Sequence, residues 1–138
     1  MTFNSSSSKP CPCGRNKNYN ACCGLLHNLS KTADTAEDLM RSRYSAFVLS
    51  HGDYLMYSHH SSTSLLSNKA DIVNWAKSVK WNGLVVHGAV NGKKSDSEGI
   101  VEFTAHYTEA GRPRKIEERS KFVIEENRWV YLGLDGSK

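Results

Sequence analysis

The four cysteines of this 138-residue chain all fall within residues 11–24, in the pattern C-x-C-x8-C-C. That stretch has almost no other apolar side chain, so burial alone cannot fold it. Zinc forms closed structural sites with four thiolates in a tetrahedron. Gly14 and Gly24 follow the two cysteine pairs, where a chain that curls around an ion needs unhindered backbone angles. The pattern therefore predicts one zinc site formed by Cys11, Cys13, Cys22 and Cys23.

Three alternatives to zinc remain open for these cysteines. Two disulfides would suit an exported protein, but residues 1–10 lack the apolar core of a signal peptide, and a reducing cytoplasm disfavours disulfides. An iron–sulfur cluster fits the adjacent pair Cys22 and Cys23 poorly, and thiols of unrelated purpose are the third alternative. Four protein thiolates leave no coordination position for an activated water. We therefore expect a cytoplasmic protein with a structural zinc ion.

Residues 11–23 read CPCGRNKNYNACC and resemble the SEC-C motif, a small zinc module of bacterial proteins. The four ligand positions match the motif. The chain departs from the motif at four positions: Arg15 replaces Ser, Asn16 replaces Gly, and Asn18 and Asn20 each replace Lys. The resemblance implies a zinc-binding module over residues 10–29. We expect the Ser-rich leader before it, residues 1–9, to be disordered.

The net charge of +4 is confined to the N-terminal part of the chain. Residues 1–31 contain four basic side chains and no acidic one, whereas residues 32–138 contain 14 of each sign. A zinc ion with four thiolates carries a charge of −2, so the module would retain only about +2. This charge is too weak to favour nucleic acid, and we expect a protein partner instead. No run approaches the roughly 20 apolar residues of a membrane helix.

Hydrophobic periodicity predicts three helices after the cysteine stretch. Leu25, Leu26 and Leu29 form an apolar patch that could dock the zinc module on the main domain. A polar linker follows this patch. Thr35-x-x-Asp38 resembles a capping box and opens the first helix, which the apolar spacing continues to about residue 50. Gly52 is expected to end that helix, and Asp53 to cap a second, shorter one. The third helix is predicted over residues 68–78.

From Val79 the hydrophobic period changes from helical spacing to two, which is typical of strands. Strands are predicted over residues 80–91, 99–108, 114–125 and 128–134. Three helices followed by an antiparallel meander indicate an α+β fold, with the helices on one concave face of the sheet.

The part of the chain after the SEC-C segment also resembles a known family, and the two unrelated parts point to the same one. The runs DLMRSRYSAF at residues 38–47, ERSKF at 118–122 and RWVY at 128–131 are similar to the YchJ-type proteins of bacteria. These proteins join SEC-C motifs to a domain of the nuclear-transport-factor-two-like, cystatin-like fold. The resemblance implies a cone over residues 34–136, in which a curved sheet wraps over three helices. Because the family has no settled activity, the resemblance indicates architecture rather than function.

Polar residues at inward-facing positions are candidates for a ligand pocket at the mouth of such a cone. Arg43 lies on the apolar stripe of the first helix, four residues from both Leu39 and Phe47. Glu118 and Ser120 lie on the apolar face of the third strand, so an ion pair between Arg43 and Glu118 is one hypothesis, either structural or pocket-lining. The candidate pocket residues are Arg43, Tyr44, His59, Glu118 and Ser120.

Two functions are consistent with these features. The first is a binding or adaptor protein whose zinc module presents a small rigid contact surface, by analogy with the SEC-C module of the SecA translocase. The second is a small-molecule-binding protein or an enzyme that uses the mouth of the cone. In that case His59 or His60 would act as a general base with Asp53, although these histidines also fit an exposed loop. Apolar residues on both faces of the last strand further suggest a homodimer formed through the sheet.

Overall fold

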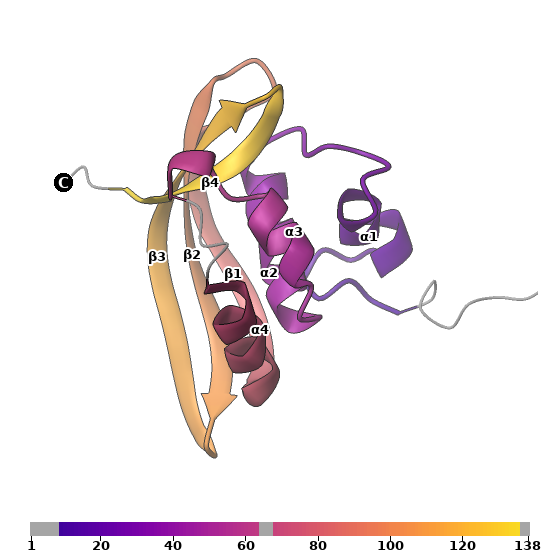
Figure 1. The fold of residues 1–138 in the computed structure, drawn as a ribbon, viewed down its shortest axis with the longest axis vertical. Helices are drawn as coiled ribbons and strands as arrows, with labels where there is room; N and C mark the ends of the chain where they lie inside the picture. Colours follow the sequence, from indigo (N-terminus) through magenta and orange to yellow (C-terminus); the bar gives the residue numbers. More distant parts are fainter. Residues whose placement is uncertain (1–8, 64–67, 136–138) are drawn as a thin grey trace, which may run out of the picture.

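The structure, a computed structural model, describes residues 9–63 and 68–135 and places the helices on one face of a four-stranded sheet (Figure 1). The helices are α1 (Cys23–His27), α2 (Ala36–Val48), α3 (Gly52–Tyr57) and α4 (Lys69–Ser78), with short 3-10 helices at Tyr19–Ala21 and Ser61–Thr63. The strands are β1 (Lys80–Asn91), β2 (Glu98–Glu109), β3 (Arg112–Glu125) and β4 (Arg128–Leu134). The predicted α+β class, with three helices on a curved antiparallel sheet, is confirmed. The predicted leader lies, apart from Lys9, outside the described residues.

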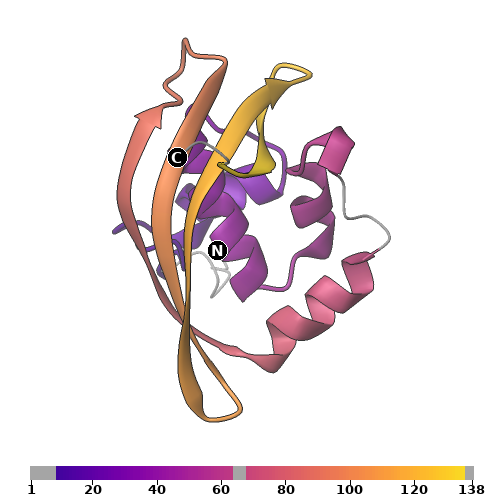
Figure 2. The same ribbon diagram turned by 90° about the vertical axis from the view of Figure 1, so that its left-hand side faces the viewer.

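The sheet is an antiparallel meander in the order β1-β2-β3-β4, and it curves around α2 (Figure 2). Two-residue turns join β2 to β3 and β3 to β4. All four turn residues have φ between 51 and 78°, namely Ala110, Gly111, Glu126 and Asn127. Positive φ at both central residues gives a turn whose twist matches that of the flanking strands. The third strand was predicted to begin at residue 114, whereas β3 begins at Arg112 and includes Pro113.

The helices α2, α3 and α4 cover the concave face of the sheet, and the N-terminal module lies beyond α2, on the side away from the sheet (Figure 1). Thr35 caps α2 as predicted, because its Oγ1 accepts a hydrogen bond from the backbone N of Asp38 at 3.0 Å. The shared core joins the helices to the sheet through Leu39, Met40, Leu55, Val101, Ala105, Phe122 and Trp129. None of the helices in the described part of the chain has the length and apolar character of a membrane span.

The connection between α2 and α3 differs from the prediction. Gly52 does not end α2, which stops at Val48; it is the first residue of α3. The cap of α3 is His51 rather than Asp53, since His51 Nδ1 accepts a hydrogen bond from the backbone N of Tyr54 at 3.3 Å. A Cβ at position 52 would lie 2.6 Å from Cγ2 of Val73. Glycine is therefore needed here for the close approach of α3 to α4.

Two glycines face each other where the connection between β1 and β2 meets the start of α2. The carbonyl of Gly92 accepts a hydrogen bond from the backbone N of Ala36 at 2.9 Å. A Cβ on Gly99 would lie 2.3 Å from Cα of Gly92, and no side-chain rotation can relieve a clash with backbone. We expect Gly99→Ala to lower the free energy of unfolding by about 2–3 kcal/mol.

Gly88→Ala in β1 is the matched control for this prediction. A Cβ at position 88 would have no neighbouring atom within 4 Å, so a change of about 0.5 kcal/mol or less is expected. Unfolding in denaturant measures both variants. An equal loss of stability in the two would show that the approach of Gly99 to Gly92 is not the constraint.

Candidate metal centre

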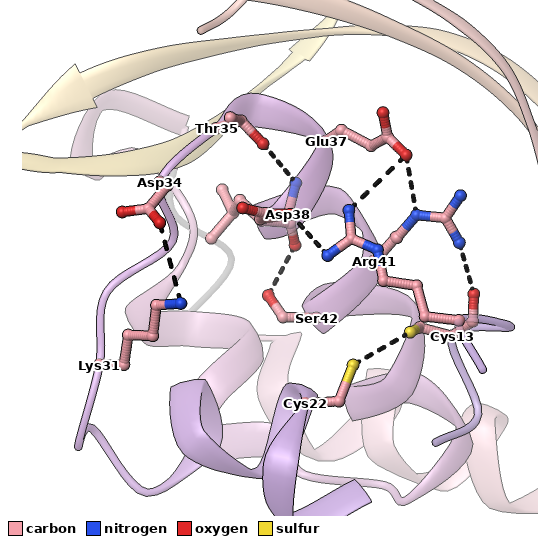
Figure 3. Close-up of polar contacts among 11 residues, drawn as sticks. Cys13, Cys22, Lys31, Asp34, Thr35, Glu37, Asp38, Arg41 and Ser42 are labelled. Atoms are coloured by element: carbon pink, nitrogen blue, oxygen red, sulfur yellow. Dashed lines mark hydrogen bonds and ion pairs between the residues drawn. The ribbon is translucent and has the colours of Figure 1, made fainter. Parts of the chain in front are cut away.

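The sulfur atoms of the four cysteines converge on one point. All lie within 4.8 Å of one another, and the sulfurs of Cys13 and Cys22 are 3.6 Å apart (Figure 3). A tetrahedral zinc–thiolate site, with Zn–S bonds of about 2.3 Å, places its sulfurs about 3.8 Å apart. None of the four thiols is in a disulfide, and three of them are buried, at Cys11, Cys13 and Cys23. The donor set therefore fits one tetrahedral metal ion.

Local backbone contacts bring the two cysteine pairs together. The backbone N of Cys11 donates to the carbonyl of Lys17 at 2.9 Å, which closes a tight loop around the first pair. Gly14 follows this pair with a φ of 88°, in the left-handed region that favours glycine. Gly24 lies in α1, and its role is close packing: a Cβ there would lie 2.8 Å from the carbonyl oxygen of Tyr19.

Without a cation, the four thiols cannot all be ionised. Hydrogen bonds from Cys13 and Cys23 lower the pKa of the Cys11 thiol. The hydrogen bond with Cys11 raises the pKa of Cys23, and burial raises the pKa of Cys22 to about 11. These interactions favour negative charge on the sulfur of Cys11 and protonation of Cys22 and Cys23. A divalent cation would replace those protons and permit four thiolates, so the chemistry of the cluster also fits a metal.

Helix α2 supplies contacts to the cysteine cluster from outside the motif. Ser45 is fully buried, and its Oγ lies 3.6 Å from the sulfur of Cys11. A hydrogen bond from Ser45 also lowers the pKa of Cys23. Arg41 Nη1 donates to the carbonyl of Cys13 at 2.8 Å (Figure 3). Such outer contacts orient metal ligands and increase metal affinity.

Ion pairs fasten the cysteine loop to the first turns of α2. Arg15 lies 2.6 Å from the carboxylate of Asp38 and 3.7 Å from that of Glu37. Glu37 also accepts a hydrogen bond from Arg41 Nε at 2.9 Å. Arg15 is one of the departures from the SEC-C motif, and its acidic partners in α2 give that departure a structural reason.

A buried histidine joins α1 to α2. His27 Nε2 lies 2.8 Å from the carbonyl oxygen of Ser42, which can only accept, so this nitrogen carries the proton. The other ring nitrogen, Nδ1, then accepts from the hydroxyl of Tyr19 at 2.6 Å. Burial lowers the pKa of His27, which favours this neutral form. Neither His27 nor Ser45 was identified from the sequence; for Ser45 the only signal was a small polar residue within the apolar pattern of α2.

The apolar patch expected to dock the module contributes one buried residue. Leu26 joins the core of the main domain, whereas Leu29 is 59% exposed. Docking therefore combines one leucine with the hydrogen bonds and ion pairs of α2.

The candidate pocket residues lie in and around one cavity. This cavity has a volume of about 140 Å³, and Arg43, Tyr44 and Glu118 line it. Ser120 is buried and donates from Oγ to Glu118 Oε1 at 2.9 Å, but it does not line the cavity. His59 is also buried and outside the lining; its ring packs edge-on against Tyr131, with the ring centroids 5.2 Å apart.

Among the described residues, Arg43 and Glu118 share the cavity without forming an ion pair. Arg43 Nη1 donates to the carbonyl of Leu55 at 3.0 Å and to Oγ of Ser58 at 2.8 Å. Its guanidinium carbon lies 4.7 Å from the centre of the Tyr131 ring. Burial lowers the pKa of Arg43 to about 10, so the side chain is still charged at neutral pH.

Asp53 does not pair with His59 or His60, so the hypothesised general-base pair is not formed. Asp53 is exposed and pairs with Lys69 at the start of α4. His60 lies 3.4 Å from the carboxylate of Glu125. The expected exposed histidine loop is also wrong for His59, whose backbone bridges to β4 beside Tyr131.

Replacing Ser45 tests whether α2 contributes to the metal site. Ser45→Ala removes the hydroxyl that would donate to the Cys11 thiolate, so we expect metal affinity to fall about 10- to 100-fold. Competition with a chromophoric chelator measures this affinity in the reduced protein. Ser78→Ala is the matched control, because Ser78 Oγ donates to a carbonyl of its own helix, that of Trp75. Equal losses in both variants would contradict the role given to Ser45.

Comparison with known proteins agrees with this architecture. The model of the family described as "YchJ, middle NTF2-like domain" matches residues 35–134. A UPF0225 protein of Bordetella pertussis is 43% identical over 140 residues, which cover 98% of each chain. A UPF0225 protein of Vibrio parahaemolyticus is 40% identical over 122 residues, which cover 88% of this chain and 72% of the relative.

Two solved structures resemble the whole arrangement. The solution structure of a SEC-C motif containing protein from Rhodopseudomonas palustris has a TM-score of 0.83 and 30% identity, covering 94% of this chain and all of that one. The crystal structure of a SEC-C motif containing protein from Psychrobacter arcticus has a TM-score of 0.81 and 31% identity, covering 98% of this chain and 88% of that one. The chain described here therefore belongs to the YchJ family, whose curated relatives are the UPF0225 proteins.

Proposed function

We propose that this protein binds one zinc ion through Cys11, Cys13, Cys22 and Cys23, and that the ion is structural. The observation that carries the proposal is the convergence of the four sulfurs within 4.8 Å of one another. Closed sites of four thiolates are typical of zinc that holds a fold together, and they leave no position for a substrate or an activated water. Thiolate ligands also persist best in a reducing compartment, which supports a cytoplasmic location.

The zinc module would then act as a binding or adaptor surface fixed on an NTF2-like scaffold. Its inner side is engaged by α2, while its outer loop is exposed and polar, with Asn16, Asn18 and Asn20 at the surface. Two of the four basic residues of segment 1–31 are paired with acidic residues of the main domain: Arg15 pairs with Asp38, and Lys31 lies 3.8 Å from Asp34. Lys9 and Lys17 have no acidic partner among the described residues. A small rigid surface with two free cations suits a protein partner with an acidic patch.

Metal analysis tests the zinc site directly. Reduced protein is expected to contain one zinc ion per chain, and Cys22→Ser to contain little or none, because a closed site needs all four ligands. Chelation of the native protein should unfold residues 10–24 of the module while the β-sheet persists. Amide spectra by NMR would show this as loss of dispersion in the module alone. Full occupancy in Cys22→Ser, or no zinc in the reduced native protein, would refute the assignment.

Charge reversal tests the adaptor role. Lys17→Glu reverses an exposed cation on the outer loop, and an acidic partner captured in stoichiometric amount by the native protein should bind it at least tenfold more weakly. Lys94→Glu, in the exposed connection between β1 and β2, makes the same charge change far along the chain and should leave binding unchanged. Both variants should retain zinc. A partner that binds the two variants equally well would not be using the module.

A further inference from the structure

The cavity between α2, α4 and the sheet has aromatic walls whose polar groups are already bonded to protein. Its lining includes Tyr44, Phe47, Trp75, Trp81, Phe103 and Tyr131. The two indole rings meet edge to face, with centroids 5.5 Å apart and planes at 88°. Trp75 Nε1 donates to Glu109 at 3.1 Å, and Trp81 Nε1 to the carbonyl of Ala76 at 3.1 Å. These bonds fix the rings and leave their carbon surfaces to face the cavity.

The size of the cavity limits what it can hold. At about 140 Å³ it is close to the engineered apolar cavity of about 150 Å³ that binds benzene. It is smaller than the roughly 300–1,000 Å³ of pockets for drug-sized ligands. One six-membered ring with a small substituent is therefore the appropriate scale.

Arg43 brings unused hydrogen-bond donors to this apolar space. A guanidinium has five N–H donors, and the hydrogen bonds of Arg43 to the described residues both come from Nη1. The donors on Nε and Nη2 have no acceptor among those residues. Arg43 as a whole residue is only 9% exposed, so bulk water is a poor substitute for a fixed acceptor.

Glu118 brings the opposite requirement. Its Oε1 accepts from Ser120 Oγ, and no cation pairs with it among the described residues. Its charge acts on Arg43 across the cavity but does not offset the effect of burial on that side chain. An ionised carboxylate accepts up to about four hydrogen bonds, so Glu118 can take a donor from a ligand.

The two charges together select the charge of the ligand. An anion would satisfy Arg43 but face the carboxylate of Glu118, and a cation would meet the reverse problem. A neutral group with one acceptor and one donor satisfies both residues, and it adds no net charge next to the buried Arg43 and the half-buried Glu118.

We propose that this cavity binds a small planar aromatic molecule that carries a neutral amide or ring lactam, with its carbonyl accepting from Arg43 and its N–H donating to Glu118. This ligand site is independent of the zinc proposal. The cavity is lined by residues of α2, α4 and the sheet. The N-terminal module that carries the cysteines lies beyond α2, on the side away from the sheet (Figure 1).

Three probes of nearly equal shape test the proposal on the zinc-loaded full chain: benzamide, benzoate and benzamidine. They are neutral, anionic and cationic respectively. Binding is followed by NMR through the indole N–H signals of the three tryptophans. Trp75 and Trp81 line the cavity, whereas Trp129 does not and donates to the carbonyl of Asp34 at 3.2 Å, so it is an internal control.

Benzamide is expected to shift the signals of Trp75 and Trp81 but not that of Trp129, with a Kd at least tenfold lower than those of the two charged probes. Glu118→Gln removes the negative charge and keeps the shape. The affinity of this variant for benzoate, relative to its affinity for benzamide, should therefore be at least tenfold higher than in the native chain. Glu117→Gln is the matched control on the neighbouring, exposed position of β3 and should change neither Kd.

Arg43→Met should abolish the binding of benzamide, and Glu118→Gln keeps the proposal testable if that variant does not fold. Three results would overturn the proposal. One is the failure of benzamide to shift Trp75 and Trp81. Another is equal or tighter binding of benzoate or benzamidine to the native chain. The third is an equal change in the ratio of benzoate to benzamide affinity in Glu117→Gln and in Glu118→Gln.

Discussion

Burial of α2 on two opposite sides is the constraint on which the rest of the structure depends. Eight of the 13 residues of this helix are buried, so it cannot have the single apolar face of an ordinary surface helix. Residues 42–45 are consecutive in this helix but contact two different sites, the cysteine module and the cavity. The carbonyl of Ser42 and the hydroxyl of Ser45 face the module, whereas Arg43 and Tyr44 line the cavity on the side of the sheet. A shift of α2 would therefore disturb both sites at once.

The cysteine module depends on α2 because it is too small to bury a core of its own. Its cluster of Cys11, Cys13 and Cys23 is closed by a serine of α2, and its loop is held through the carbonyl of Cys13 and the side chain of Arg15. A metal that binds only the native arrangement adds its binding free energy to the stability of that arrangement. In this chain the native arrangement includes the contacts between module and helix. Metal binding and docking on α2 should therefore strengthen each other.

Features that depend on residues close together in the sequence were predictable from the sequence. The four cysteines, the cap of α2 by Thr35 and the strands after Val79 each depend on residues a few positions apart. Contacts between distant segments were not. Gly52 was expected to end a helix because its packing against Val73 cannot be seen in sequence, and Ser45 carried no sign of the sulfur 34 residues earlier. The inward position of Arg43 was predictable from helical spacing, but its hydrogen-bond partners were not.

The arrangement of charges around the cavity supports the proposed binding site over a polar contact that only supports the fold. Arg43 does support the fold, since Nη1 joins α2 to the end of α3 through Leu55 and Ser58. That role uses two of five donors and does not involve Glu118. A purely structural pair would be expected to close on itself, because direct contact offsets the desolvation of both charges. Here each charge has its own neutral partner, and an apolar space of about 140 Å³ remains between aromatic walls. The proposed ligand, which would bridge the two charges, would account for both the separation and the space.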